Sequence, residues 1–201
     1  MRKDESFFRE KITKILQEKK SVIDIGGGLR IDPTRNNRGI HNPWAIELAK
    51  KVDYKIMDKV PDYKPDIVGD IHKLPFADNS LEAILCIYVL EHVEEPHTAV
   101  KEMYRTLKPG GYCFIQVPFI FYYHPMPGYY KDFYRFTRDG LEYLLRDFSS
   151  IEIVNERGAL ATVMNMFPLF TKRTRFFEMI DRWIKKDGSN QTSGFCVFAK
   201  K

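Results

Sequence analysis

A short apolar run near the N-terminus breaks on three consecutive glycines, as VIDIGGG at residues 22–28. Such a β-branched run predicts a buried strand of a parallel sheet. The glycines after it let the backbone turn tightly and approach a ligand closely, although a tight turn without a ligand is an alternative. Asp24 is expected near the carboxyl end of the strand, where open α/β sheets bind their ligands. A dinucleotide fingerprint would need a further glycine at Ile31, so a nicotinamide enzyme is disfavoured.

Strand-like and helix-like segments alternate along the chain, which predicts a parallel sheet with right-handed crossovers. The expected strands are residues 21–25, 52–58, 66–71, a segment within 81–93, 112–118, 150–156 and 193–201. The expected helices are an amphipathic one at 5–19, a segment at 44–51, one that begins at Pro96 and stops at Pro109-Gly110-Gly111, one at 137–148 with Thr137 as its N-cap, and one at about 173–186.

A polar segment at residues 29–43 replaces the helix that normally follows the first strand of such a fold. Prolines and a glycine interrupt it, which delays the helix to residues 44–51. The segment carries basic side chains near the expected ligand site: Arg30, Arg35, Arg38 and His41. Two interpretations stay open, a solvated loop and a cover that contacts an anionic substrate or the cofactor.

Two acids close consecutive predicted strands. Asp58 ends the second strand, thirty positions after Gly28, and Asp70 ends the third. A carboxylate at the end of the second strand can accept hydrogen bonds from both ribose hydroxyls of a nucleoside. The alternative for each is an acid in a surface turn. Two strand-end acids beside a glycine turn favour the nucleoside interpretation.

Composition limits the class and the compartment. The chain has 201 residues, a net charge of +5 and no apolar stretch near the ~20 residues of a membrane span. Its N-terminus lacks the apolar core of a signal peptide, so a cytoplasmic protein is expected. The three cysteines (Cys86, Cys113 and Cys196) lack metal-like spacing and are expected to be buried free thiols, so no metal site is predicted.

Five short motifs follow one another along the chain. They are VIDIGGG at 22–28, GDI at 69–71, LPF-x-D-x-S at 74–80, VLEHV at 89–93 and LKPGG at 107–111. With them the chain resembles the class I S-adenosylmethionine-dependent methyltransferases from about residue 21 to 118. The segment DFYRFT-x-x-GL at 132–141 is also similar to members of that group, which extends the resemblance to most of the chain.

The resemblance implies an α/β, doubly wound, Rossmann-like fold. Its mostly parallel sheet has seven strands in the order 3-2-1-4-5-7-6, with strand 7 antiparallel and helices on both faces. One methyltransferase domain is expected over residues 1–201. Residues 1–20 form an N-terminal helix, 21–118 the cofactor-binding core and 119–201 the acceptor side, with a helical insertion at 159–187 between strands 6 and 7.

The resemblance also implies S-adenosylmethionine as the cofactor. The implied contacts lie around the carboxyl ends of the first four strands: Asp24, Gly26, Gly27, Gly28, Asp58, Asp70, Ile71, Cys86 and Tyr88. In that arrangement the methionine part borders the glycine turn, Asp58 binds the ribose hydroxyls, and Asp70 with Ile71 holds the adenine. The sequence departs from the family pattern at Arg30, where a third glycine is usual.

Methyl transfer from a sulfonium is an in-line displacement, and an oxygen or amine acceptor must also lose a proton. His124, among aromatic residues after the fifth strand, and His92, past the fourth, are the candidate catalytic bases. Their alternatives are a histidine packed among tyrosines and a histidine that orients its loop. Arg30, Tyr134 and Arg135 are candidate substrate contacts, and the latter two have an alternative role in docking the helix after them.

These features predict transfer of a methyl group to a small or medium acceptor, through oxygen or nitrogen. A metabolite and a glycan- or lipid-linked intermediate are the expected acceptor classes. The fourth strand reads CIYV and lacks the asparagine-proline-aromatic motif that points to amino groups of bases or glutamine. The rival interpretations are an RNA methyltransferase that uses the basic surface, with nucleic acid the less favoured partner, and a non-catalytic cofactor-binding module.

The insertion at 159–187 leaves three interpretations open. Phe176, Ile180, Trp183 and Ile184 fall on one helical stripe, and basic residues surround it. The insertion could cover the sheet edge and close the acceptor pocket, form the interface of a homodimer of an otherwise monomeric chain, or rest on an anionic membrane as a peripheral contact.

Overall fold

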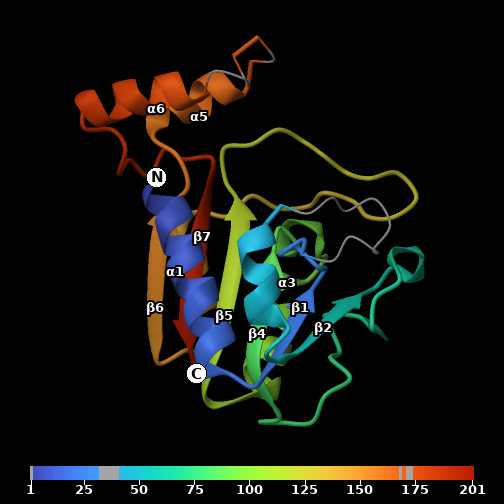
Figure 1. The fold of residues 1–201 in the computed structure, drawn as a ribbon. Coiled ribbons are helices and arrows are strands. Elements are labelled where there is room, and N and C mark those ends of the chain that lie inside the picture. Colours follow the sequence, from blue (N-terminus) through green and yellow to red (C-terminus); the bar gives the residue numbers. More distant parts are fainter. Residues whose placement is uncertain (1, 32–40, 168, 171–173) are drawn as a thin grey trace.

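The computed structural model describes residues 2–31, 41–167, 169–170 and 174–201, drawn as a ribbon in Figure 1. Arg35 and Arg38, two basic residues of the segment that was interpreted as either a solvated loop or a cover, lie outside these residues. Lys172 and Arg173, two of the basic residues around the predicted stripe of the insertion, lie outside them as well.

The predicted sheet is confirmed in strand order and direction. Its order is β3-β2-β1-β4-β5-β7-β6. The strands are β1 (Ser21–Ile25), β2 (Asp53–Asp58), β3 (Ile67–Val68), β4 (Leu81–Ile87), β5 (Leu107–Pro118), β6 (Ser150–Asn155) and β7 (Gly194–Lys200). Pairs from β3 to β5 are parallel, and β7 runs antiparallel to both β5 and β6.

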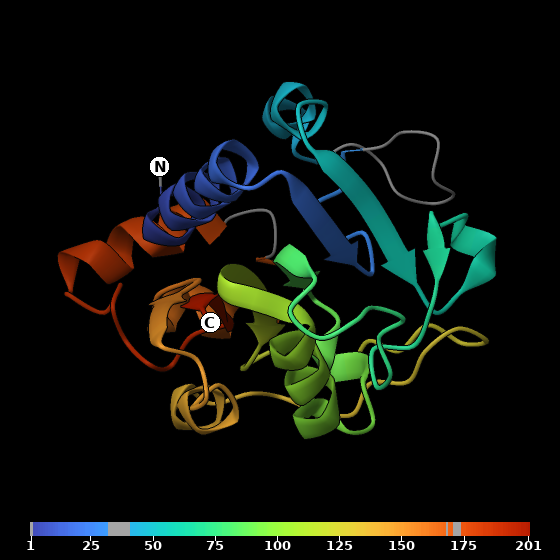
Figure 2. The same ribbon diagram turned by 90° about the horizontal axis from the view of Figure 1, so that it is seen from below.

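Helices cover both faces of the sheet (Figure 2). The α-helices are α1 (Lys3–Glu18), α2 (Ile46–Ala49), α3 (Pro96–Thr106), α4 (Arg138–Leu144), α5 (Ala159–Asn165) and α6 (Thr174–Trp183). Short 3₁₀ helices are η1 (Pro43–Ala45), η2 (Pro61–Tyr63) and η3 (Leu90–His92). The delayed helix predicted at 44–51 is therefore present as η1 and α2, and α1 and α6 fall where helices were expected.

The core has two layers because successive strand side chains point to opposite faces. On β5, Phe114 packs with α1 and α2, whereas Cys113 and Ile115 pack with α3 and α4. On β4, Leu85 and Cys86 divide between the two faces in the same way. Buried positions on every central strand therefore hold the sheet between two helical layers.

The fifth strand begins earlier than predicted. The sequence LKPGG was expected to end a helix, but α3 ends at Thr106 and β5 already begins at Leu107. Leu81 pairs with Leu107, whereas Ala83 pairs with Tyr112, so the β5 side holds extra residues. Such a bulge needs an unusual backbone, which Gly110 supplies with a φ of +76°.

Two other elements are shorter than expected. β3 contains Ile67 and Val68, so Asp70 lies beyond the strand, where it forms an isolated bridge with Lys73. α4 ends at Leu144 rather than at 148, and the side chain of Thr137 accepts a hydrogen bond from the Gly140 amide as the predicted N-cap. The strand-end position of Asp70 is therefore retained by a turn and not by the sheet ladder.

The predicted insertion between the last two strands is a pair of helices, α5 and α6. Asp181 of α6 joins them, because its carboxylate accepts hydrogen bonds from the Leu160 and Ala161 amides, each at 2.8 Å. These are first-turn amides of α5, which have no partner within their own helix. In Figure 1 the pair lies beyond one end of the sheet, beside the N-terminal end of α1.

Candidate active site at the carboxyl ends of the strands

A cleft of about 890 Å³ opens at the carboxyl ends of the central strands. It lies next to β1, whose neighbours β2 and β4 flank it on opposite sides, which is the position where open α/β sheets bind ligands. The lining comes from the glycine turn, the ends of β2 and β4, the turn after β3 and residues 125–133. The cleft therefore lies where the sequence predicted a ligand site.

The glycine turn after β1 leaves no room for side chains. A Cβ on Gly26 would lie 2.5 Å from Val89 Cγ2, and one on Gly28 would lie 2.5 Å from the Ile87 carbonyl oxygen. Gly26 and Gly27 both have positive φ angles, +77° and +60°. The close approach of this turn to β4 therefore requires glycine, and Gly26 and Gly28 line the cleft.

Asp24 stabilises the glycine turn through hydrogen bonds to its backbone. It is fully buried, and its carboxylate accepts hydrogen bonds from the Gly28 amide at 3.1 Å, the Leu29 amide at 3.0 Å and the Tyr54 hydroxyl. Asp24 is not among the residues that line the cleft. The structure therefore places this predicted cofactor contact under the turn, where it fixes the backbone that borders the cleft.

Arg30 occupies the backbone conformation for which glycine is usual, with a φ of +52°. It lines the cleft together with His41, and Arg30 Nη1 lies 3.3 Å from His41 Nδ1. The His41 amide also donates to the Arg30 carbonyl at 3.0 Å, and Asn42 donates to the Leu29 carbonyl at 2.8 Å. The two ends of the predicted polar segment are therefore tied together at the rim of the cleft.

The two predicted strand-end acids both line the cleft. Asp58 accepts a hydrogen bond from the Val60 amide at 2.9 Å. Asp70 accepts from the His72 amide at 2.9 Å, pairs with His72 Nδ1 at 2.6 Å and lies 3.1 Å from Lys59 Nζ. Partial burial works to raise the pKa of Asp70, but these hydrogen bonds outweigh it and hold the pKa at about 2. Asp70 is therefore a carboxylate at any physiological pH.

The two residues predicted as cofactor contacts at the end of β4 have different positions relative to the cleft. Cys86 is fully buried within the sheet and is not part of the cleft lining, whereas Tyr88 lines the cleft. Tyr88 has a φ of +53°, and its hydroxyl donates to Glu156 Oε1 at 2.6 Å. Gln116 Nε2 donates to both groups. A bulky residue in this backbone region is strained, and such strain gathers at ligand sites.

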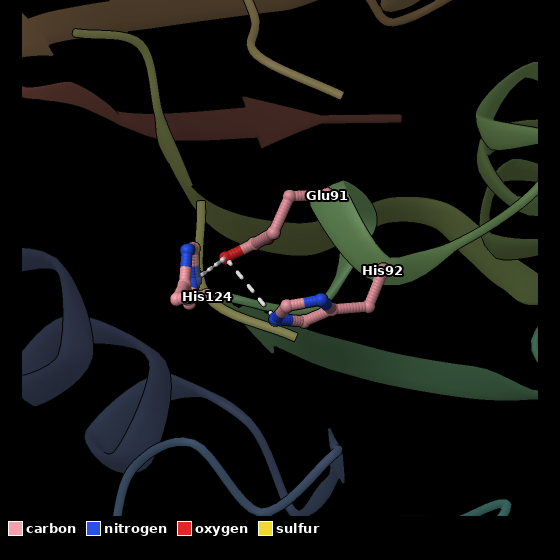
Figure 3. A group of neighbouring side chains, drawn as sticks. All are labelled: Glu91, His92 and His124. Carbon is pink, nitrogen blue, oxygen red and sulfur yellow. Dashed lines mark ion pairs between the residues drawn. The ribbon is translucent and has the colours of Figure 1, made fainter. Parts of the chain in front are cut away.

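The two predicted catalytic histidines lie side by side next to the cleft (Figure 3), with ring centroids 5.1 Å apart. His92 lines the cleft, whereas His124 is not among the lining residues. Both Nε2 atoms lie 3.9 Å from Oε1 of Glu91, a residue that the sequence analysis did not single out. Burial lowers the pKa of His92.

Glu91 is an unusual carboxylate because it is fully buried. Neither of its oxygens has a hydrogen-bond donor among the residues that the structure describes. Burial raises the pKa of Glu91 to about 8, and the nearby charge of Asp132 acts in the same direction while that of Arg135 opposes it. Such a group stands out because buried carboxylates are normally paired or bound to a cation.

Tyr134 and Arg135, predicted as substrate contacts, do not line the cleft. The Tyr134 hydroxyl donates to the Glu94 carbonyl at 2.9 Å. Arg135 donates to both carboxylate oxygens of Asp132, at 2.6 and 2.7 Å, and to the carbonyls of Phe121 and Tyr122. The pair therefore organises the segment after β5, and the Asp-x-x-Arg spacing within DFYRFT is the signal that could have indicated it.

An aromatic wall forms the remaining side of the cleft. Tyr63 and Tyr129 stack with ring centroids 5.4 Å apart, and Tyr130 and Phe133 continue the lining. No described residue of α5 or α6 lines the cleft. The structure therefore gives no support to the interpretation of the insertion as a lid over the acceptor pocket.

Comparison with known proteins assigns the domain. Residues 23–115, nearly half of the chain, match the family described as methyltransferase domain. The demethylmenaquinone methyltransferase of Renibacterium salmoninarum is 37% identical over 91 residues, which are 44% of this chain and 34% of that protein. The ubiquinone/menaquinone biosynthesis C-methyltransferase UbiE of Desulfotalea psychrophila is 50% identical over 46 residues, 23% of this chain and 19% of that protein. The chain thus spans about a third or less of the length of these curated relatives.

The solved structures show the same fold. A crystal structure of a SAM-dependent methyltransferase from Archaeoglobus fulgidus aligns with a TM-score of 0.58 and 17% identity, over 96% of this chain and 94% of that chain. No helix of the described residues is both long and apolar enough to cross a membrane. Residues 23–115 are thus similar to a methyltransferase domain, and the strand order together with the cleft at the carboxyl ends of the strands gives the chain a Rossmann-like methyltransferase fold.

Proposed function

We propose that this protein transfers a methyl group from S-adenosylmethionine to a small or medium acceptor. The observation that carries the proposal is the meeting of the glycine turn, Asp58 and Asp70 in one cleft at the end of β1. The cleft volume of about 890 Å³ is at the upper end of the range for small-molecule sites, which suits a cofactor and an acceptor together.

The residues present fit this cofactor. Asp70 is held as a carboxylate, and a carboxylate accepts hydrogen bonds from hydroxyl and amino groups such as those of a nucleoside. Asp58 lies at the end of the neighbouring strand, and the glycine turn brings main chain rather than side chains to the cleft. We propose that Asp58 holds the ribose, Asp70 and Ile71 the adenine side, and Gly26 and Gly28 the methionine part.

When bound, the cofactor supplies an electrophilic methyl group on a positively charged sulfonium. The chain's own part is to align the acceptor with that methyl group and to exclude water, which can provide most of the acceleration. Tyr88 and Tyr130 line the cleft, and the faces of aromatic rings favour a nearby cation. His92 and His124 remain proposals as acceptors of the proton that an oxygen or nitrogen acceptor loses.

The aromatic wall favours an acceptor with an apolar or aromatic body. Tyr63, Tyr129, Tyr130 and Phe133 all line the cleft, and the rings of Tyr63 and Tyr129 stack on one another. We propose oxygen or nitrogen as the acceptor atom. The names of the two relatives refer to methylation at carbon in ubiquinone and menaquinone biosynthesis and to demethylmenaquinone, so a carbon acceptor of quinone type is the second candidate.

A second observation, the exposed surface of α6, concerns the place where the protein could bind its acceptor. The buried side of α6 is acidic, with Glu178 and Asp181, while several of its apolar side chains face solvent. Trp183 is 84% exposed, and Phe176 and Met179 are each 54% exposed. The helix also carries basic side chains at Arg175 and Arg182, and Lys185 and Lys186 follow directly after its end. We propose that this face rests on an anionic membrane surface from the cytoplasmic side, which would give access to a lipid-linked acceptor.

Transfer of labelled methyl groups tests the proposal. The protein is incubated with cell extract and S-adenosylmethionine that carries an isotopic methyl group, and label is followed in the metabolite, lipid and RNA fractions. Label in metabolites or lipids, identified by product mass spectrometry, is the expected result. Label in RNA alone would replace the proposed acceptor class with nucleic acid. Absence of transfer in every fraction, despite cofactor binding, would leave the non-catalytic module as the function.

A further inference from the structure

Three potential metal ligands converge beside the cleft from two separate parts of the chain. Glu91 and His92 lie on η3, and His124 lies in the aromatic segment after β5. One ligand atom from each lies within 4.8 Å of the others, and each histidine Nε2 is 3.9 Å from the same Glu91 oxygen (Figure 3). We propose that Glu91, His92 and His124 bind one divalent transition-metal ion.

In each histidine, Nδ1 lies within hydrogen-bond distance of a main-chain carbonyl oxygen. His92 Nδ1 lies 2.7 Å from the Lys131 carbonyl oxygen, and His124 Nδ1 lies 3.0 Å from the Tyr122 carbonyl oxygen and 3.3 Å from Asp132 Oδ2. His92 Nδ1 next to a carbonyl oxygen must donate, so in the neutral ring its lone pair is on Nε2, toward Glu91. His124 Nδ1 also lies 3.3 Å from Arg135 Nη2, but its shorter contact of 3.0 Å to the Tyr122 carbonyl oxygen favours the same tautomer. Histidines that bind metals are oriented in this way by a carbonyl or carboxylate.

This arrangement leaves three acceptor atoms facing one another. When Glu91 is ionised, two imidazole lone pairs and a carboxylate oxygen repel unless a proton or a metal cation lies between them. Glu91 is fully buried, and its oxygens have no donor in the part of the chain that the structure describes. The guanidinium of Arg135 does not meet this need, because its nitrogens donate to Asp132 and to main-chain carbonyls, and its contact with His124 is to Nδ1, at 3.3 Å, rather than to Nε2. A dication would offset the buried charge and satisfy all three groups.

The donor set indicates the class of metal. Two imidazoles and one carboxylate suit Zn²⁺, Fe²⁺, Co²⁺ or Mn²⁺, whereas Mg²⁺ and Ca²⁺ prefer oxygen ligands. Metal–ligand bonds of about 2.0–2.1 Å put tetrahedral ligand atoms roughly 3.4 Å apart. The 3.9 Å separations therefore need to close by only a few tenths of an ångström.

Three protein ligands leave coordination positions open, and His92 lines the cleft. If the proposed methyl transfer to an oxygen is correct, a chelating acceptor hydroxyl could bind the ion there, lose its proton more readily and be oriented toward the methyl group. This extension rests on the proposed function, whereas the metal site itself does not. It also replaces the general-base role predicted for the two histidines, because their Nε2 atoms would bind the ion.

Metal binding by the full chain tests the site without any turnover. Chelator-treated protein is titrated with Zn²⁺ alone by calorimetry and with Co²⁺ alone by visible absorption. We expect one ion per chain, a Co²⁺ spectrum of four- or five-coordinate N/O ligation, and at least tenfold weaker binding in Glu91→Gln and in His124→Ala. His97→Ala removes an exposed histidine of α3 and should bind as the parent does.

Thermal unfolding provides the second measurement. Zn²⁺ should raise the melting temperature of the parent and of His97→Ala but not that of Glu91→Gln, because only a ligand that binds the folded state stabilises it. Absence of one-to-one binding in the parent, or equal binding in Glu91→Gln, overturns the proposal. If a ligand variant fails to fold, the stoichiometry and the Co²⁺ spectrum of the parent still decide. A missing metal site would leave cofactor binding and methyl transfer untouched, so the two proposals fail separately.

Discussion

Two carboxylates show how strongly local surroundings set charge in this protein. Asp70 is held at a pKa of about 2 by hydrogen bonds from His72 and Lys59 that outweigh its partial burial. Asp4 of α1 is raised to a pKa of about 6, first by burial and then by the charge of Glu156, against the opposing charge of Arg2. The first suits a permanent ligand contact, whereas the second costs stability when it ionises.

The raised pKa of Asp4 predicts a pH dependence of folding. Because the folded pKa of about 6 exceeds the ordinary value of 3.8, the folded state binds more protons between these values, and its stability falls as pH rises through that window. The substitution Asp4→Asn removes this loss. The unfolding free energy of the variant relative to that of the parent should therefore be roughly 1–3 kcal/mol higher at pH 7 than at pH 4. Urea denaturation at both pH values measures the gain, and parallel behaviour of the two proteins would contradict it.

At the scale of single residues, the sequence predicted positions better than contacts. Asp58, Asp70, Gly26 and Gly28 lie at the cleft because strand ends can be located from local pattern, and Tyr88, which the resemblance implied, lies there as well. The role of Arg135 was only partly predictable, since Asp132 lies three residues away in the sequence, whereas the carbonyls of Phe121 and Tyr122 meet Arg135 only after the segment folds back. Glu91 was missed for the same reason. Its meeting with His124 joins residues more than thirty positions apart.

Among the elements, the bulge at the start of β5 makes a direct prediction about glycine. A Cβ on Gly111 would lie 2.8 Å from the Lys108 carbonyl oxygen and 3.2 Å from that of Glu82, and both are backbone atoms. Gly111→Ala should therefore destabilise the fold by about 1–3 kcal/mol, as overpacking does. Gly188→Ala is the matched control, because a Cβ there meets nothing within 4 Å. Chemical denaturation compares the two, and equal midpoints would refute the role of the bulge.

The exposed apolar side chains of α6 lead to a second prediction at the scale of elements. The protein should co-sediment with anionic vesicles and not with neutral ones, because apolar and basic side chains act together at such a surface. Trp183→Glu places a charge at the most exposed aromatic side chain of the helix and should abolish the binding. Tyr143→Glu changes a 62% exposed aromatic residue of α4 and should leave it intact.

Two results would contradict the proposal that the exposed face of α6 binds an anionic membrane surface. One is a parent protein that does not bind anionic vesicles, and the other is binding that Trp183→Glu leaves unchanged. A homodimer in sedimentation velocity that dissociates in Trp183→Glu would assign the face to the interface instead. The sequence predicted an apolar stripe here correctly in period, but it could not tell which side faces the protein, because Glu178 and Asp181 find their partners in Arg2 and in the first turn of α5.

Over the whole molecule, the site follows from the order of the strands. β1 lies between β2 and β4, so the chain leaves the centre of the sheet in both directions and opens a space at the strand ends. Local pattern predicted the alternation of elements, whereas the order of all seven strands came from the resemblance, since spacing alone does not determine which strands pair. The extent of the domain over residues 1–201 stays a prediction.

Binding of S-adenosylhomocysteine by calorimetry tests the central claim most directly. The parent should bind one molecule per chain. Asp58→Ala should bind roughly 10–100-fold more weakly, because a charge-assisted hydrogen bond to a ligand is worth about 1.5–3 kcal/mol. Asp53→Ala changes an exposed acid at the opposite end of the same strand and should bind as the parent does. Absence of binding in the parent, or equal affinity in Asp58→Ala and Asp53→Ala, would contradict a cofactor site at the strand ends.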